Sequence, residues 1–128
     1  MNSDLQCPAT VVLVPVEMLH AGASVLTAAG ARYAGVFAAG DVASDAGNFA
    51  RVAALAQQVA CRVEILAAAV DAASIKEGMG DLADLYRGET IIVIARRVAI
   101  AEVLRWAGDV MRPVAVAIDS AGWVVREL

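Results

Sequence analysis

The stretch Thr10-Val11-Val12-Leu13-Val14 runs directly into Pro15-Val16-Glu17. Apolar residues in unbroken succession are typical of a strand that is buried on both faces of a parallel sheet. A second run of this kind covers residues 90–95. Because strand-like and helix-like segments alternate with short connections, the sequence predicts an α/β fold with a mainly parallel sheet.

Apolar spacing and capping residues predict helices over 28–39, 48–60, 81–87 and 98–107. The first would have Thr27 as its N-cap and Gly40 as its terminator. Ser74-x-x-Glu77 resembles a capping box, but Gly78 and Gly80 each weaken a helix by about 1 kcal/mol, so the third begins only at Asp81. The predicted inward faces are Ala29, Tyr33, Val36 and Phe37 in the first helix, Phe49, Val52, Ala53, Ala56 and Val59 in the second, and Ile100, Val103, Leu104 and Ala107 in the last.

Further strands are predicted over 62–66, where Val63 and Ile65 alternate with charged residues, and in a very short segment around Val42. Residues 113–119 and 122–126 read as a C-terminal β-hairpin. The predicted architecture is a three-layer α/β/α sandwich formed by one domain, residues 1–128.

The hydropathy of the chain argues against a membrane protein. The chain is 60% hydrophobic with a mean hydropathy of +0.67, but its longest uncharged stretch, 18–31, falls short of the ~20 apolar residues that cross a bilayer. No signal-peptide pattern precedes the first strand, so a cytoplasmic location without membrane association is expected. A strongly apolar, alanine-rich chain also makes a homo-oligomer plausible, although the sequence does not locate an interface.

Several classes of partner and cofactor lack support. A net charge of −4 argues against nucleic acid, because backbone binding needs concentrated Lys and Arg. Cys7 and Cys61 form no C-x-x-C and are expected to be partly buried, reduced thiols, and no metal site is expected. Neither G-x-G-x-x-G nor G-x-x-x-x-G-K occurs, so no nucleotide cofactor is expected.

Several segments, in this order, carry a likeness to a known family: Val11-Val12-Leu13-Val14, Leu26-Thr27-Ala28-Ala29-Gly30, Ser44-Asp45, Gly88-Glu89-Thr90-Ile91-Ile92-Val93-Ile94, and Ala117-Ile118-Asp119 with Gly122-Trp123-Val124-Val125. Together they resemble the first strand, first helix start, second helix start, second-histidine strand and closing hairpin of the histidine phosphatase superfamily, which includes phosphoglycerate mutases. The resemblance implies a phosphoglycerate mutase-like fold over nearly the whole chain.

The same resemblance implies that the catalytic positions are degenerate. Where the family has Arg-His-Gly, this chain has Pro15, Val16 and Glu17, so a hydrocarbon stands at the nucleophile position. The second-helix arginine falls on Asn48, one helical turn before Arg51, and the second histidine falls on Arg96. The expected function is therefore a catalytically inactive histidine-phosphatase-like domain with a binding, assembly or regulatory role.

Arg96 and Arg97 leave an alternative open. They follow a predicted strand and precede a predicted helix, a place where anions collect, so they could hold a phosphorylated or carboxylated small molecule without turnover. The favoured interpretation is instead that one of them pairs with Glu17 across the former active site and the other is solvated. A third hypothesis, a phosphatase with relocated residues, would require His20, the sole histidine, to converge with Arg96.

Overall fold

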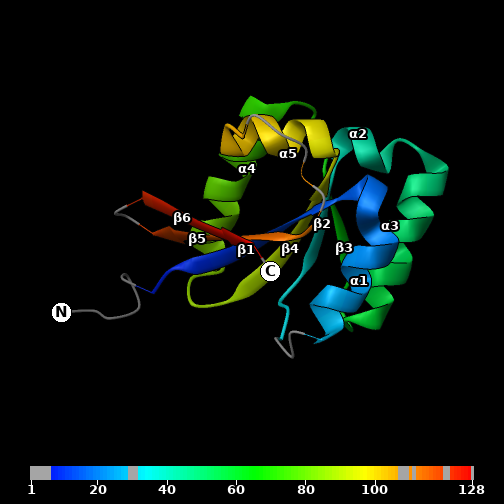
Figure 1. The fold of residues 1–128 in the computed structure, drawn as a ribbon, viewed down its shortest axis with the longest axis horizontal. Coiled ribbons are helices and arrows are strands. Elements are labelled where there is room, and N and C mark those ends of the chain that lie inside the picture. Colours follow the sequence, from blue (N-terminus) through cyan, green and yellow to red (C-terminus); the bar gives the residue numbers. More distant parts are fainter. Residues whose placement is uncertain (1–6, 29–31, 107–109, 111, 120–121, 128) are drawn as a thin grey trace.

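The computed structural model describes residues 7–28, 32–106, 110, 112–119 and 122–127. Its core is a six-stranded mixed sheet in the order β3-β2-β4-β1-β5-β6 (Figure 1). Neighbouring strands among β3, β2, β4 and β1 pair in parallel, while β5 and β6 form the antiparallel C-terminal hairpin. The strands are β1 (Ala9–Pro15), β2 (Val36–Ala39), β3 (Val63–Leu66), β4 (Thr90–Ala95), β5 (Val114–Asp119) and β6 (Gly122–Glu127).

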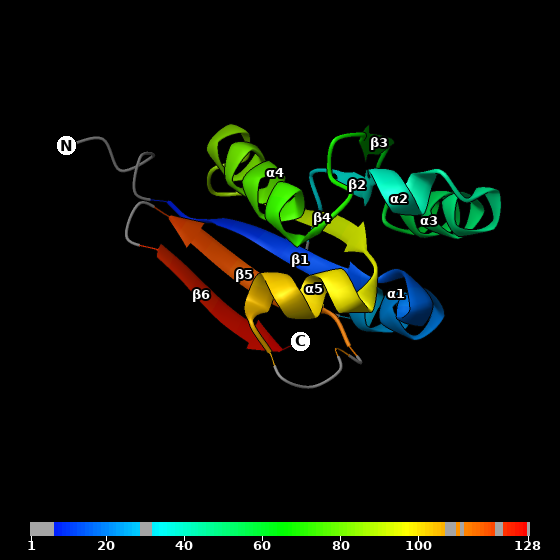
Figure 2. The ribbon, with the colours of Figure 1, turned by 90° about the horizontal axis from the view of Figure 1, so that it is seen from above.

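Helices cover both faces of this sheet, so the predicted three-layer α/β fold is confirmed. α1 (Leu19–Ala28) and α3 (Ala46–Gln58) pack together on one face, and α4 (Ala72–Leu85) and α5 (Arg97–Leu104) pack together on the other. The hairpin and β3 lie at opposite edges of the sheet (Figure 2). No helix of the described residues is long and apolar enough to span a bilayer.

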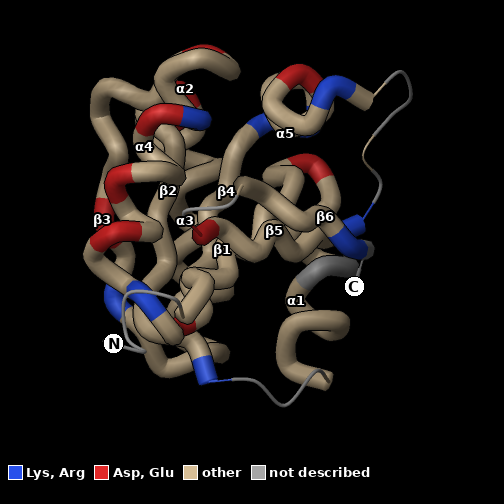
Figure 3. Tube along the Cα trace, turned by 90° about the vertical axis from the view of Figure 1, so that its left-hand side faces the viewer, with Lys and Arg blue, Asp and Glu red and all other residues tan. Residues whose placement is uncertain are grey.

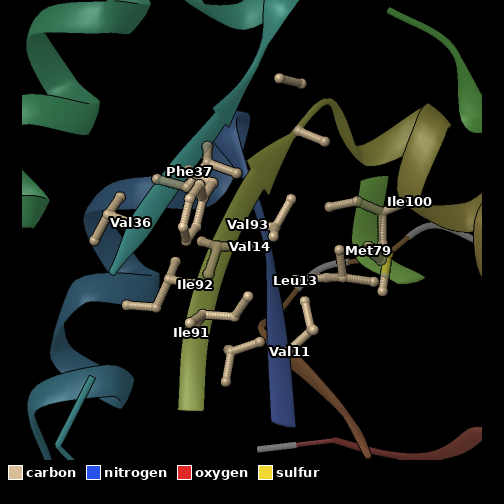
Figure 4. Packing of buried hydrophobic residues seen from close by; sticks show 14 of the residues in the cluster. Val11, Leu13, Val14, Val36, Phe37, Met79, Ile91, Ile92, Val93 and Ile100 are labelled. Carbon is tan, nitrogen blue, oxygen red and sulfur yellow. The ribbon is translucent and has the colours of Figure 1, made fainter. Parts of the chain in front are cut away.

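The two strands predicted to be buried are the centre of the core. All of β1 is buried except Thr10, and all of β4 except Thr90. Leu13 lies beside Met79 of α4 and Ile100 of α5 (Figure 4), while Phe37 of β2 is opposite Val93 in the sheet and its ring contacts that of Tyr86. The hydrophobic effect at this sheet therefore holds the carboxyl ends of β1, β2 and β4 in fixed relative positions.

The predicted first helix over 28–39 is wrong. The chain turns through η2 (Val16–Met18) into α1, and Val36–Ala39 is the fully buried strand β2. A short apolar run does not distinguish a buried strand from a buried helix by periodicity, and here pairing with β3 and β4 decides the outcome. Thr27 is not an N-cap, because its hydroxyl donates to the Ala23 carbonyl inside α1 at 3.0 Å.

The consequences for the neighbouring residues follow directly. Tyr33 is half-buried in the link before β2, and Ala29 lies outside the described residues. Gly40 begins the short helix α2 (Gly40–Ala43) instead of ending a helix, so the strand expected around Val42 is also absent; Val42 is buried in α2. Val36 and Phe37 are thus buried as predicted, but they belong to a strand and not to a helix.

α3 begins and ends two residues earlier than predicted. Asp45 is its N-cap, and the Asn48 amide donates to the Asp45 carboxylate at 2.9 Å. Val52 and Ala56 are buried as expected, together with Leu55, but Ala53 is exposed. The buried stripe thus includes Leu55 in place of the predicted Ala53.

α4 is much longer than the predicted helix over 81–87. Its N-cap is Asp71, and Ser74 occupies the third helical position, so the capping box is Asp71 with Ser74 and not Ser74 with Glu77. The helix tolerates Gly78 and Gly80 because its buried face packs against the sheet and α5; that face is formed by Ile75, Met79, Leu82 and Ala83.

The cap of α4 predicts an acid-sensitive contribution to stability. Hydrogen bonds from the Ser74 hydroxyl at 2.6 Å and the Ser74 amide at 2.8 Å lower the pKa of Asp71. The contribution is fully present above the ordinary carboxyl pKa of about 4 and is lost as the pH falls through the lowered folded-state pKa. We expect Asp71→Asn, which keeps a capping side chain, to lower the melting temperature at neutral pH but not in strong acid. A deficit that stays constant with pH would contradict this.

The helix predicted over 98–107 is confirmed with a different end, and the predicted C-terminal hairpin is confirmed. α5 ends at Leu104, with Arg105 in the left-handed conformation as C-cap, so the predicted end at 107 is too late; Ala107 and Gly108 lie outside the described residues. Ile100 and Val103 are buried as predicted, whereas Leu104 is half-buried. The C-terminal hairpin is confirmed by the antiparallel pairing of β5 with β6.

Candidate functional site at the carboxyl edge of the sheet

The candidate site lies where the parallel strands end. Pro15 of β1 pairs with Ala95 of β4, so Val16 and Arg96 follow neighbouring strands at the same edge. β2 ends at Ala39 on the other side of β4, and Asp41 follows it. The basic position where β4 leads into α5 is visible in Figure 3. Ligand sites of open α/β sheets lie at such carboxyl edges.

Val16 fills this edge with hydrocarbon. Its side chain is 3% exposed within the η2 turn, and Pro15 before it is also buried. A valine side chain can neither donate a hydrogen bond nor attack phosphorus. The position that the family resemblance assigns to the nucleophile is therefore part of the hydrophobic core.

The Glu17 side chain, which comes from η2, lies at the N-terminus of α5. Its Oε1 accepts a hydrogen bond from the Arg97 backbone amide at 2.9 Å. The free amides and the dipole of a helix N-terminus favour a negative charge, and here the protein supplies that charge itself. The predicted partner of Glu17 was an arginine side chain; the partner that the structure shows is the arginine main chain.

Arg96 pairs with a carboxylate that the sequence interpretation missed. Its Nε lies 3.3 Å from Asp41 Oδ2; the Arg96 side chain is 62% exposed and that of Asp41 is 22% exposed. Asp41 Oδ1 is buried and has no hydrogen-bond partner among the described residues. Asp41 was placed in a connecting loop because β2 was read as helix; the sequence signal for it is the apolar run Val36–Ala39 followed at once by Gly40-Asp41.

Gly40 allows the segment after β3 to lie against this edge. The Gly40 amide donates to the Ala69 carbonyl at 2.9 Å. A Cβ built on Gly40 would lie 2.5 Å from the Ala67 carbonyl oxygen, closer than atoms in proteins approach. The link between β3 and α4 therefore packs onto the start of α2, next to Asp41.

The other candidate residues lie elsewhere. His20 of α1 and Arg51 of α3 are both exposed, and with Leu19 and Leu55 they line a small cavity of about 180 Å³ between these helices. Arg96 does not line this cavity. Asn48 is in the first turn of α3, where its amide serves the Asp45 cap. Among the described residues, no group of three or more His, Cys, Asp or Glu side chains could hold a metal ion.

The whole-chain arrangement of strands and helices has a counterpart of known structure. The chain has a phosphoglycerate mutase-like fold. A phosphoglycerate mutase from Plasmodium falciparum superposes with a TM-score of 0.65, covering 95% of this chain and 91% of that chain. The two sequences are 11% identical, so the likeness is one of fold. The sequence matches no protein-family model and no curated protein.

The phosphoglycerate mutase-like fold and the closing hairpin that the resemblance implied are both confirmed. The structure also corrects one of the quoted segments. Leu26-Thr27-Ala28 was matched to the start of a helix, but in this chain these residues end α1. Ser44 and Asp45 do precede a helix, since Asp45 caps α3.

Proposed function

We propose that this chain is a catalytically inactive histidine-phosphatase-like domain, formed by residues 1–128, that acts through binding, assembly or regulation. The single observation that carries the proposal is the Glu17 carboxylate on the Arg97 amide, next to the buried Val16. In this fold that edge would have to present a nucleophile and hydrogen-bond donors to a phosphoryl group, and here the space holds an apolar side chain and an anion.

The charges at this edge support the proposal. Phosphoryl transfer through a protein nucleophile needs cationic or N–H donors around the phosphoryl oxygens. The first amide of α5 is already used by Glu17, and Arg96 is already neutralised by Asp41. Two like unit charges 4 Å apart repel by about 4 kcal/mol at an effective dielectric constant of 20. A phosphate dianion entering here would face both carboxylates.

The same contacts weigh against the two alternative functions. An anionic ligand on the Arg96 side chain would have to compete with Asp41, and one at the Arg97 amide would have to displace Glu17. A relocated active site would need His20 next to Arg96, but His20 lines a cavity with Arg51 between α1 and α3. Neither alternative is favoured by a contact in the structure.

A hydrolysis assay with a phosphate-binding assay tests the proposal. We expect the purified protein to leave para-nitrophenyl phosphate unhydrolysed and to show no phosphate-dependent rise in melting temperature. Removing the two negative charges with the double variant Glu17→Gln, Asp41→Asn is expected to create a weak, salt-sensitive phosphate shift, because a phosphate dianion near Arg96 is then no longer repelled by carboxylates. Hydrolysis that His20→Ala abolishes, or a wild-type phosphate shift that Arg96→Ala abolishes, would overturn it.

A further inference from the structure

A larger cavity lies at the opposite edge of the sheet, away from the candidate site. It has a volume of about 810 Å³ and is formed where α1 and α3 end and β2 and β4 begin. Residues from all four places line it, among them Thr27, Gln58, Ala34 and Thr90. Cavities that bind small molecules commonly measure roughly 300–1,000 Å³ and combine apolar walls with a few polar groups.

The apolar wall of this cavity is fixed by tertiary contacts. Leu26 is fully buried, and Tyr33 and Val59 are half-buried. The Tyr33 hydroxyl donates to the Leu26 carbonyl at 3.0 Å, and the Cys61 thiol donates to the Tyr33 carbonyl at 3.0 Å. Burial raises the pKa of both Tyr33 and Cys61, so both groups keep the protons that these contacts need. The wall is thus held in shape without a ligand.

Two opposite charges line the same cavity without forming an ion pair with each other. Arg32 and Glu89 are both exposed, and within the part of the chain described here no ion pair joins them. The Arg32 guanidinium and the Glu89 carboxylate are therefore available to a ligand that carries one charge of each sign. Arginine favours carboxylates because its planar donors bind both oxygens.

The helix ends add to the negative side of the cavity. α1 and α3 both point their carboxyl ends at it, through Leu26 and Thr27 and through Gln58 and Val59. Neither helix has a basic residue in its last turn. The carbonyl end of a helix carries partial negative charge and favours a cation. An ammonium group is therefore favoured both by the Glu89 carboxylate and by these two helix ends.

We propose that this cavity binds a small zwitterion with an apolar side chain, of the kind found in free amino acids and short peptides. Glu89 and the helix ends take the ammonium group, Arg32 takes the carboxylate, and the half-buried Tyr33 and Val59 take the apolar side chain. The inference is independent of the proposed loss of phosphatase chemistry, because it uses the other edge of the sheet.

Calorimetric titration with defined probes tests this proposal. L-leucine and L-leucyl-L-leucine are the two zwitterions, and their different sizes separate a free amino acid from a peptide. N-acetyl-L-leucine lacks the ammonium group, and L-leucinamide lacks the carboxylate. We expect at least one zwitterion to bind and each single-charge analogue to bind at least about tenfold more weakly, since charge-assisted hydrogen bonds are the strong ones. Absence of binding by both zwitterions at millimolar concentration would overturn the proposal.

Matched variants test which charged group of the ligand Arg32 and Glu89 each bind. Arg32→Gln is expected to weaken binding of the zwitterion and to remove its advantage over L-leucinamide, while Glu89→Gln removes its advantage over N-acetyl-L-leucine. Arg126→Gln and Glu77→Gln change exposed charges that do not line the cavity and are the controls. All four positions are exposed, so the fold is expected to persist. Unchanged zwitterion binding in both Arg32→Gln and Glu89→Gln would contradict the assignment, whatever the hydrolysis assay shows.

Discussion

Replacing Gly40 by alanine is expected to destabilise the protein by at least about 2 kcal/mol, because the added methyl group collides with backbone. Its Cβ would lie 2.5 Å from the Ala67 carbonyl oxygen and 3.2 Å from the Leu66 carbonyl oxygen. Neither atom is the flexible end of a side chain, so β3 and the link to α4 would have to move. The measurement is the free energy of unfolding from urea titration.

Gly80→Ala is the matched control, because it makes the same chemical change in open space. Gly80 is inside α4, and a Cβ built on it would have no atom within 4 Å other than its chain neighbours and the adjacent backbone of its own helix. Alanine is favoured over glycine in a helix interior by roughly 0.5–1 kcal/mol, so this variant should be more stable than the wild type. If both variants shifted stability in the same direction, the close approach at Gly40 would not be the cause.

Leu13→Ala is expected to cost about 2–5 kcal/mol, the range for removing a buried leucine side chain. Leu13 belongs to β1 and has no exposed surface. Its side chain lies beside those of Met79 and Ile100 (Figure 4). Helices α4 and α5 are held by the sheet, so the space left behind cannot collapse fully. The readout is again the free energy of unfolding.

An exposed leucine provides the comparison for this core variant. Leu85, at the end of α4, is 76% exposed. Leu85→Ala removes the same atoms from a position that water already reaches, so its effect should stay within about 0.5 kcal/mol. Equal losses in Leu13→Ala and Leu85→Ala would mean that burial in the core around β1 is not what stabilises the fold.

The long apolar strands were the most predictable part of the fold. β1 and β4 were recognised because a buried parallel strand reads as an unbroken apolar run, and the hairpin because a turn separates two alternating segments. β2 was misread, since Val36–Ala39 is only four residues long and contains two alanines. That one error displaced the first helix and hid Asp41 from the candidate site.

The sequence predicted only part of the candidate site. Glu17 and Arg96 were singled out because the family resemblance places them at catalytic positions, each directly after a strand that the sequence makes evident. Their partners were not predictable from local sequence. The pairing of β1 with β4 brings the Arg97 amide to Glu17, and the pairing of β2 with β4 brings the Asp41 carboxylate to Arg96. The cavity lined by Arg32 and Glu89 likewise joins residues that are far apart in sequence.

The two central strands and the closing hairpin follow from the sequence alone. Local composition is sufficient for these features, since they depend on residue type and on neighbours along the chain. Contacts between distant segments determine that 36–39 is a strand, that Glu17 accepts a hydrogen bond from the first amide of α5 and that Asp41 pairs with Arg96. These outcomes depend on burial and pairing between distant segments, which no local pattern encodes.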